Sequence, residues 1–232
     1  MINTAAILAG GLCGALFGRL LTDNAQETLT KVCGVSTLFI ALSGALEEMM
    51  TVEGAALSSG GAMLLIGCLA LGALVGELAN VEGAFERFGQ WLKRVTGNSR
   101  DSAFVDAFVT ASLTVCIGAM AIVGSIQDGL SGDPSTLFTK SILDFIILII
   151  YASTYGKGAL FSAIPVAILQ GGVTVCAGLL QPIFSPIVIA NLSFLGNMMI
   201  FCVGCNLAFQ AKFRVANMLP ALVFGALGVT FF

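Results

Sequence analysis

The chain has 232 residues, of which 57% are hydrophobic and 10% are charged, and its mean hydropathy is +1.00. A soluble domain carries roughly 25% charged residues, so the composition excludes an ordinary soluble protein and indicates an integral membrane protein. The net charge of −3 offers no basic surplus for nucleic acid, and the lack of histidine excludes histidine-based triads, zinc sites and proton relays.

Apolar runs long enough to cross a bilayer recur along the chain. A hydrocarbon core about 30 Å thick needs roughly 20 apolar residues per helix. The sequence predicts eight transmembrane segments, at 3–21, 32–50, 61–79, 104–126, 142–156, 158–181, 187–208 and 215–232. Because the runs lack the alternation of a transmembrane barrel strand, we expect an all-α polytopic helical bundle. The fifth segment is short and the sixth contains Pro165, which leaves their boundaries open.

The basic residues predict the orientation of these segments. With both termini outside, only Lys140 lies on the outer side. Nine basic residues then lie on the inner side: Arg19, Lys31, Arg87, Lys93, Arg94, Arg100, Lys157, Lys212 and Arg214. This bias matches the positive-inside rule, so the sequence predicts an N-out/C-out arrangement within a single membrane domain.

The longest polar stretch, 80–102, has apolar residues at helical spacing, with Arg87, Lys93 and Arg94 at other positions. This pattern predicts an amphipathic helix in the inner membrane interface. We interpret it as an anchoring linker between the third and fourth segments, and a partner-binding role is the alternative.

An internal repeat and small residues indicate close helix packing. The stretch 14–20 (GALFGRL) echoes 72–78 (GALVGEL), and 43–48 more weakly echoes 123–128, which predicts that helices 1–2 and 3–4 are copies of one hairpin. Glycine ridges let helices approach closely in membranes. The candidate packing glycines are Gly10, Gly14, Gly18, Gly72 and Gly76. We expect contacts within one chain, and contacts between chains of a homo-oligomer are the alternative.

Ionisable and amide side chains surround the turn between the fourth and fifth segments. The candidates are Gln127, Asp128, Asp133, Lys140 and Asp144. On a helix, Lys140 and Asp144 are neighbours at i and i+4. Ionisable groups at membrane depth are costly and are functional hypotheses by default. We therefore interpret these residues as part of a solute or ion pathway near the outer boundary. Ordinary turn chemistry is the alternative.

Later segments add polar residues to this predicted pathway. Gln170 precedes Gly171 and Gly172, with Pro165 earlier in the segment, a combination that favours a kinked or broken helix. The seventh segment carries three amide side chains, Asn191, Asn197 and Asn206. They are predicted to line the pathway, and hydrogen bonds between helices are the alternative.

The sequence shows no pattern typical of an enzyme. The seven cysteines fall within apolar segments, where cysteine acts as a small apolar residue. We expect no metal site, no cofactor and no catalytic residues, because nucleophile elbows, phosphate loops and metal-ligand spacings are lacking.

Three stretches carry a resemblance to a known family: 118–129 (GAMAIVGSIQDG) continuing to Asp133, Lys140 and Asp144, 161–165 (FSAIP), and 214–222 (RVANMLPAL). The chain resembles, over essentially its full length, the YqgA/YdfK-like family of bacterial inner-membrane proteins, domain of unknown function 554. The resemblance implies a multi-pass protein of the bacterial cytoplasmic membrane, and it carries over no catalytic or binding residues.

Two functions follow from these observations. The first is a transporter or permease for a small solute, with a proton or cation as the coupling ion. It would bind the ion at Asp128 and Asp144, and Gln170, Asn191 and Asn197 would line the path. The alternative is a non-transporting membrane scaffold or regulator that acts through helix–helix contacts. The expected partners are the lipid bilayer and an unidentified small solute or ion.

Overall fold

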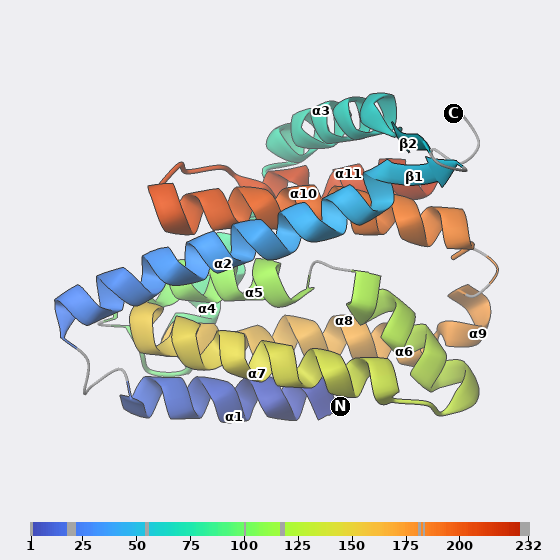
Figure 1. The fold of residues 1–232 in the computed structure, drawn as a ribbon. Coiled ribbons are helices and arrows are strands. Elements are labelled where there is room, and N and C mark those ends of the chain that lie inside the picture. Colours follow the sequence, from blue (N-terminus) through green and yellow to red (C-terminus); the bar gives the residue numbers. More distant parts are fainter. Residues whose placement is uncertain are drawn as a thin grey trace.

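The computed structural model describes residues 2–17, 22–53, 56–99, 101–116, 119–180, 182 and 184–227. Most of these residues are helical. Within these ranges the one sheet is an antiparallel hairpin of β1 (Met50–Glu53) and β2 (Ala56–Ser59), in which Met50 pairs with Ser59. The hairpin connects the second and third helices at one end of the molecule (Figure 1).

The longer helices lie side by side along one direction (Figure 1). They are α1 (Ile2–Phe17), α2 (Asp23–Met49), α3 (Ala62–Ala79), α7 (Ser135–Tyr155) and α10 (Pro186–Phe209). Shorter elements complete the bundle: α4 (Val81–Val95), α5 (Phe104–Cys116), α6 (Ala119–Ser131), the 3-10 helix η2 (Lys157–Ser162), α8 (Ala163–Val175), α9 (Ala177–Leu180), the 3-10 helix η3 (Val215–Met218) and α11 (Pro220–Leu227).

Length and apolar composition identify the elements that are able to cross a membrane. Five described stretches qualify, namely α2, α3, α7, η2 with α8, and α10. A sixth is added if α5 and α6 form one span bent by 59°. The apolar stretches of α1 and of η3 with α11 are shorter. A helical membrane protein is therefore confirmed, whereas eight crossings and the N-out/C-out orientation stay predictions.

Three boundaries differ from the sequence prediction. The fourth predicted segment corresponds to two described helices, α5 and α6, which are bent by 59° relative to each other. The fifth begins at Ser135 rather than 142, because Lys140 and Asp144 pair with each other and so lie within the helix. In the turn before α7, the Asp133 carboxylate accepts a hydrogen bond from the Ser135 backbone N–H at 3.0 Å. The sixth changes from 3-10 to α geometry at Ala163, and α8 then continues through Gly171 and Gly172. The break therefore precedes Pro165.

The packing glycines contact helices of the same chain. A Cβ atom on Gly10 would lie 2.5 Å from the Phe145 carbonyl oxygen of α7, and one on Gly14 would collide with Ile149. Gly72 and Gly76 likewise contact the backbones of Ala221 and Asn217. Gly18 lies outside the described residues. The two glycine ridges thus pack against different elements, α7 and η3–α11, and the predicted hairpin repeat stays a prediction.

Candidate functional site

A buried polar cluster joins α1, α7 and α8. Lys140 Nζ donates to both carboxylate oxygens of Asp144, at 2.9 and 2.8 Å. Asn3 Nδ2 donates to Asp144 Oδ2 at 2.8 Å and to Gln170 Oε1 at 3.3 Å. The exposed fractions are 1% for Asn3, 7% for Lys140, 3% for Asp144 and 4% for Gln170. The four side chains therefore form one hydrogen-bonded group closed off from the surface.

Close packing of α1 on α7 brings this cluster together. Asn3 lies seven residues before Gly10 and eleven before Gly14, so all three occupy one face of α1. Because Gly10 and Gly14 have no side chains, that face lies against the α7 backbone at Phe145 and Ile149. The Asn3 amide can then reach Asp144, which lies 141 positions away in sequence.

The ion pair lies deep within a helix of membrane length. With 21 residues at about 1.5 Å per residue, α7 is about 31 Å long, close to the thickness of a hydrocarbon core. Asp144 is about 13 Å from the start of α7. With α7 beginning at Ser135, Asp144 lies near the midpoint of the helix, and its predicted position near the outer boundary of the membrane stays a prediction. Well-packed apolar residues are often as stabilising as a buried ion pair, so the pair is poorly explained by stability alone.

Two atoms of the cluster have no hydrogen-bond partner among the described residues. They are the acceptor Asn3 Oδ1 and the donor Gln170 Nε2. Buried polar atoms are nearly always satisfied, so such atoms call for an explanation. A bound water has the right chemistry, because it can donate to Asn3 Oδ1 and accept from Gln170 Nε2. The cluster can therefore bind a small polar molecule beside the ion pair, with Gln170 Nε2 as the donor and Asn3 Oδ1 as the acceptor.

Gln127 and Asp133 form the turn between α6 and α7 instead of joining the buried cluster. Gln127 Nε2 donates to Asp133 Oδ2 at 2.9 Å, and Thr136 Oγ1 donates to Gln127 Oε1 at 2.8 Å. The hydrogen bond from the Ser135 backbone is the largest of the contacts that lower the pKa of Asp133. Asp128 is half-buried on α6, and no described hydrogen bond of its side chain joins it to either group. These contacts have the form of turn chemistry.

The three asparagines of α10 contact separate partners. Asn191 Nδ2 donates to the Gly225 carbonyl of α11 at 3.2 Å. Asn197 donates to Ser193 Oγ at 3.4 Å and lies against Gly44 of α2. Asn206 donates to the Phe213 carbonyl and accepts from the Phe213 N–H, at 2.8 and 2.6 Å. The predicted pathway residues therefore fall into several groups. Lys140, Asp144 and Gln170 join through Asn3, whereas Gln127 pairs with Asp133 in the turn.

A polar cavity of about 540 Å³ lies between α4, α5, α10 and the segment after α10. Its charged lining residues are Glu82, Glu86, Asp106, Lys212 and Arg214, and Asn206 also lines it. Burial, the largest contribution, raises the pKa of the half-buried Glu82 above its usual value. Of the predicted pathway residues, Asn206 alone lines this cavity.

A second network links α3, α4 and η3. The Glu77 carboxylate pairs with Arg214 and accepts a hydrogen bond from Asn217 Nδ2 at 2.5 Å. Asn217 Oδ1 in turn accepts from the Glu82 backbone N–H at 2.8 Å. Asn217 is almost fully buried, so one amide joins the end of α3 to the start of α4.

Sequence reasoning missed Asn3 and Asn217. Asn3 had a detectable signal, since it is a lone amide on the glycine face of an apolar helix. Asn217 lies within the stretch 214–222 that carries the family resemblance, but its partners are more than 130 positions away. A sequence pattern cannot reveal contacts of that range.

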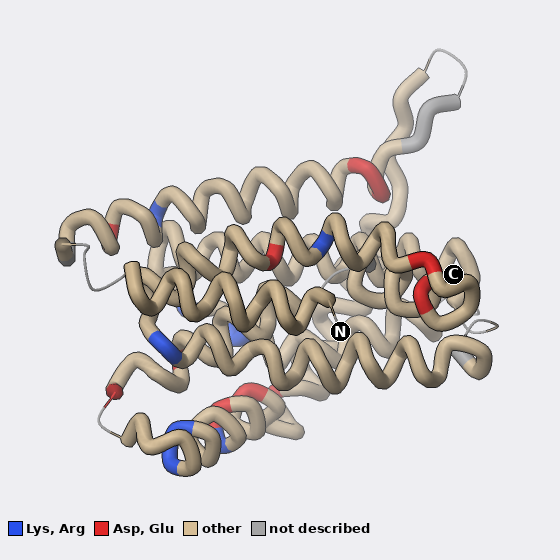
Figure 2. Tube along the Cα trace, turned by 90° about the horizontal axis from the view of Figure 1, so that it is seen from below, with Lys and Arg blue, Asp and Glu red and all other residues tan. Residues whose placement is uncertain are grey.

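Apolar helices of membrane length around a buried ion pair define a multi-helix membrane protein, and most other charges lie on α4 and near helix ends (Figure 2). Residues 1–230 match the family described as "Protein of unknown function (DUF554)", and the chain belongs to that family. It is 30% identical to the uncharacterised protein YqgA of Escherichia coli (strain K12), over 96% of this chain and 92% of the relative. It is 26% identical to the uncharacterised membrane protein YdfK of Bacillus subtilis (strain 168), over 96% and 91%. No solved structure matches the chain.

Proposed function

We propose that this protein transports a small solute across the bacterial inner membrane and that the Lys140–Asp144 cluster is its coupling site. The observation that carries the proposal is the closed ion pair near the midpoint of α7, hydrogen-bonded to residues from two other helices. Ionisable residues at such depth mark ion and substrate paths in membrane proteins. The proton or cation predicted from the sequence would bind at Asp144.

The mechanism is an exchange of partners on the Asp144 carboxylate. In the described state Lys140 neutralises Asp144, and Asn3 Nδ2 bridges Asp144 to Gln170. A proton or cation that binds Asp144 displaces Lys140 and weakens the hydrogen bond from Asn3. Because Asn3 and Gln170 belong to α1 and α8, this local change of charge alters how both helices contact α7. Binding at one carboxylate is thereby coupled to the arrangement of three helices.

The polar cavity is the proposed site of solute entry. Acidic groups of α4 and α5 line it, and the Lys212 ammonium lies on the segment after α10. The cavity can therefore accommodate polar solutes of either charge. Its basic residues belong to the set predicted to lie on the inner side. We assign solute entry to this cavity in place of the pathway near the outer boundary expected from the sequence.

The alternative, a non-transporting scaffold, has one supporting observation. Asn191 joins α10 to α11 by a hydrogen bond of the kind that only holds helices together. The glycine ridges are not free for a partner, however, because Gly10, Gly14, Gly72 and Gly76 are already covered by α7 and by η3–α11. We therefore place the scaffold second.

Transport by purified protein in proteoliposomes tests the proposal. A pH-sensitive dye inside the vesicles would report flux during a screen of amino acids, organic acids, nucleosides and inorganic cations. We expect flux with one solute class, and its loss in Asp144→Asn and Lys140→Met. The matched controls are Glu27→Gln and Lys31→Met, which break an exposed pair of the same spacing and should keep full flux. Flux in folded Asp144→Asn equal to that of wild type, or no flux with any class, would contradict the proposal.

A further inference from the structure

An apolar groove of about 540 Å³ lies on the other side of α4 from the polar cavity. Its lining is apolar and includes Val81, Phe85, Phe88, Ile122, Ile168 and Leu192. The volume is in the range of sites for small ligands. Ile168 is 68% exposed and Phe88 is 37% exposed, so the groove opens at the protein surface.

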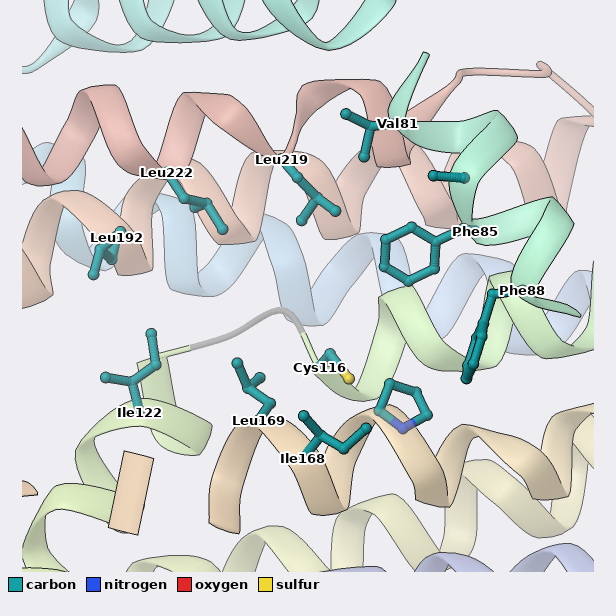
Figure 3. Close-up of a pocket in the computed structure, with 12 residues that line it drawn as sticks. Val81, Phe85, Phe88, Cys116, Ile122, Ile168, Leu169, Leu192, Leu219 and Leu222 are labelled. Carbon is teal, nitrogen blue, oxygen red and sulfur yellow. The ribbon is translucent and has the colours of Figure 1, made fainter. Parts of the chain in front are cut away.

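The groove is elongated and begins at α4. Figure 3 shows Val81, Phe85 and Phe88 at one end, and Leu192 and Ile122 at the other. Lipid tails are as apolar as leucine, so an open apolar groove in a bilayer is filled by hydrocarbon at little cost. This shape fits a single acyl chain that enters beside α4 and runs along the bundle.

The α4 end of the groove carries features of a membrane–water interface. Phe88 stacks on Trp91, with ring centroids 5.7 Å apart, and Trp91 is 54% exposed. Tryptophan is enriched at the level of lipid headgroups. Phe88 and Trp91 form an aromatic stripe on α4. Arg87 and Arg94 are both exposed and lie on the same flank of this stripe, because they are seven residues apart on one helix. An acyl chain that enters the groove at this end would place its headgroup near α4, where the two guanidinium groups are exposed.

We propose that this groove is a binding site for an anionic phospholipid, with one acyl chain between α4 and α8 and the phosphate at Arg87 and Arg94. Guanidinium groups bind phosphate oxygens through paired charged hydrogen bonds, which a zwitterionic headgroup offsets with its own cation. The site is independent of the Lys140–Asp144 cluster and of whether the protein transports a solute.

The chain's single tryptophan makes the headgroup preference measurable. In nanodiscs that hold one protein each, we expect brominated-chain phosphatidylglycerol to quench Trp91 fluorescence more than brominated-chain phosphatidylcholine at equal mole fraction. The apparent preference should fall roughly fivefold for each basic side chain removed by Arg87→Gln and Arg94→Gln. The matched control is Lys31→Gln with Lys157→Gln, which removes the same charge elsewhere and should leave the preference intact.

A second variant tests the groove itself. Ile168→Trp fills it from the rim, and Ile66→Trp on α3 is the control, since Ile66 is 70% exposed and lies outside the groove. In native mass spectrometry, Ile168→Trp should retain several-fold less phosphatidylglycerol than Ile66→Trp. Equal quenching by both headgroups, or equal lipid retention by both variants, would overturn the proposal. A preference for phosphatidylglycerol that occurs only at high protein density would assign the groove to a second copy of the chain. That result would also overturn the proposal.

Discussion

Two lysine–carboxylate pairs in this protein share the same spacing and differ in their surroundings. Glu27 and Lys31 on α2 are 2.7 Å apart, and their side chains are 63% and 55% exposed. Lys140 and Asp144 on α7 are 2.8 Å apart, with side chains only 9% and 4% exposed. The i and i+4 spacing predicts the contact in both pairs, whereas burial determines how much each pair contributes to stability.

The order of charges reinforces this difference. In α2 the carboxylate precedes the lysine, which is the more favourable order on a helix, and in α7 the order is reversed. Exposed pairs of this type contribute about 0.3–0.5 kcal/mol. The α7 pair therefore has the less favourable order and the more costly location, which agrees with a role other than helix stability.

The largest expected effect comes from breaking the buried pair on one side. Asp144→Asn leaves the Lys140 ammonium buried without a counter-charge, and we expect a loss of about 3–5 kcal/mol in the free energy of unfolding. Glu27→Gln should cost less than about 0.5 kcal/mol. Unfolding of both variants in detergent micelles would measure the contrast. Equal losses would show that the burial of the α7 pair has no energetic consequence.

The next effect concerns the helix contact that encloses the cluster. Gly14→Ala places a methyl group against Ile149 of α7, so we expect a loss of about 1–3 kcal/mol from overpacking. Gly67→Ala on α3 is the matched control, because no atom lies within 4 Å of the added Cβ. That control should be neutral or slightly stabilising, since alanine is the better helix former. A neutral Gly14→Ala would mean that α1 shifts freely along α7.

Removing both charges should change stability less than removing one. Lys140→Met combined with Asp144→Leu leaves no unpaired charge, and we expect stability within about 1 kcal/mol of wild type. The same variant should show no transport, because it lacks the proposed coupling group. Calorimetry and proteoliposome flux on one preparation separate the two readouts. A double variant that transports would remove the pair from the mechanism.

The smallest effect concerns Glu82, a carboxylate that is half-buried beside the like charges Glu86 and Glu77, with Arg214 nearby. Burial raises its pKa above the usual 4.5. The folded state then holds its proton to higher pH than the unfolded state, so stability falls as pH rises from 4.5 to the raised value. Glu82→Gln should remove this fall, which we expect to be below about 1 kcal/mol because solvent still screens a half-buried carboxylate. Unfolding between pH 4 and 8, with Glu86→Gln as control, measures it.

Hydropathy and residue spacing predicted the features that depend on residues close in sequence, namely the helices and the contacts within one helix. Helices occupy parts of all eight predicted segments, and the contact of Lys140 with Asp144 follows from their positions on one helix face. The start of α7 was misplaced because charged residues interrupt the apolar run. Those charges are tolerated in the helix since they pair with each other and with Asn3.

Other features depend on contacts between distant segments. Gln170 was singled out for its place in a broken helix, yet its partner Asn3 is 167 positions away. Asn191, Asn197 and Asn206 look alike in sequence, yet they bond to α11, to α10 itself and to the segment after α10, respectively. Local patterns identify the polar residues of a membrane helix, and the packing of the other helices determines which of them meet.

The junction between α3 and α4 fixes the orientation of α4 relative to α3. Asn80, at a φ of 50°, ends α3 and caps α4, and Asn217 holds both Glu77 and the Glu82 N–H. The side-chain amide of Asn217, which is 135 positions after Glu82 in the chain, therefore holds the angle between the two helices. Because α4 cannot rotate relative to α3 without breaking these hydrogen bonds, a tilt of α3 also reorients the aromatic stripe on α4.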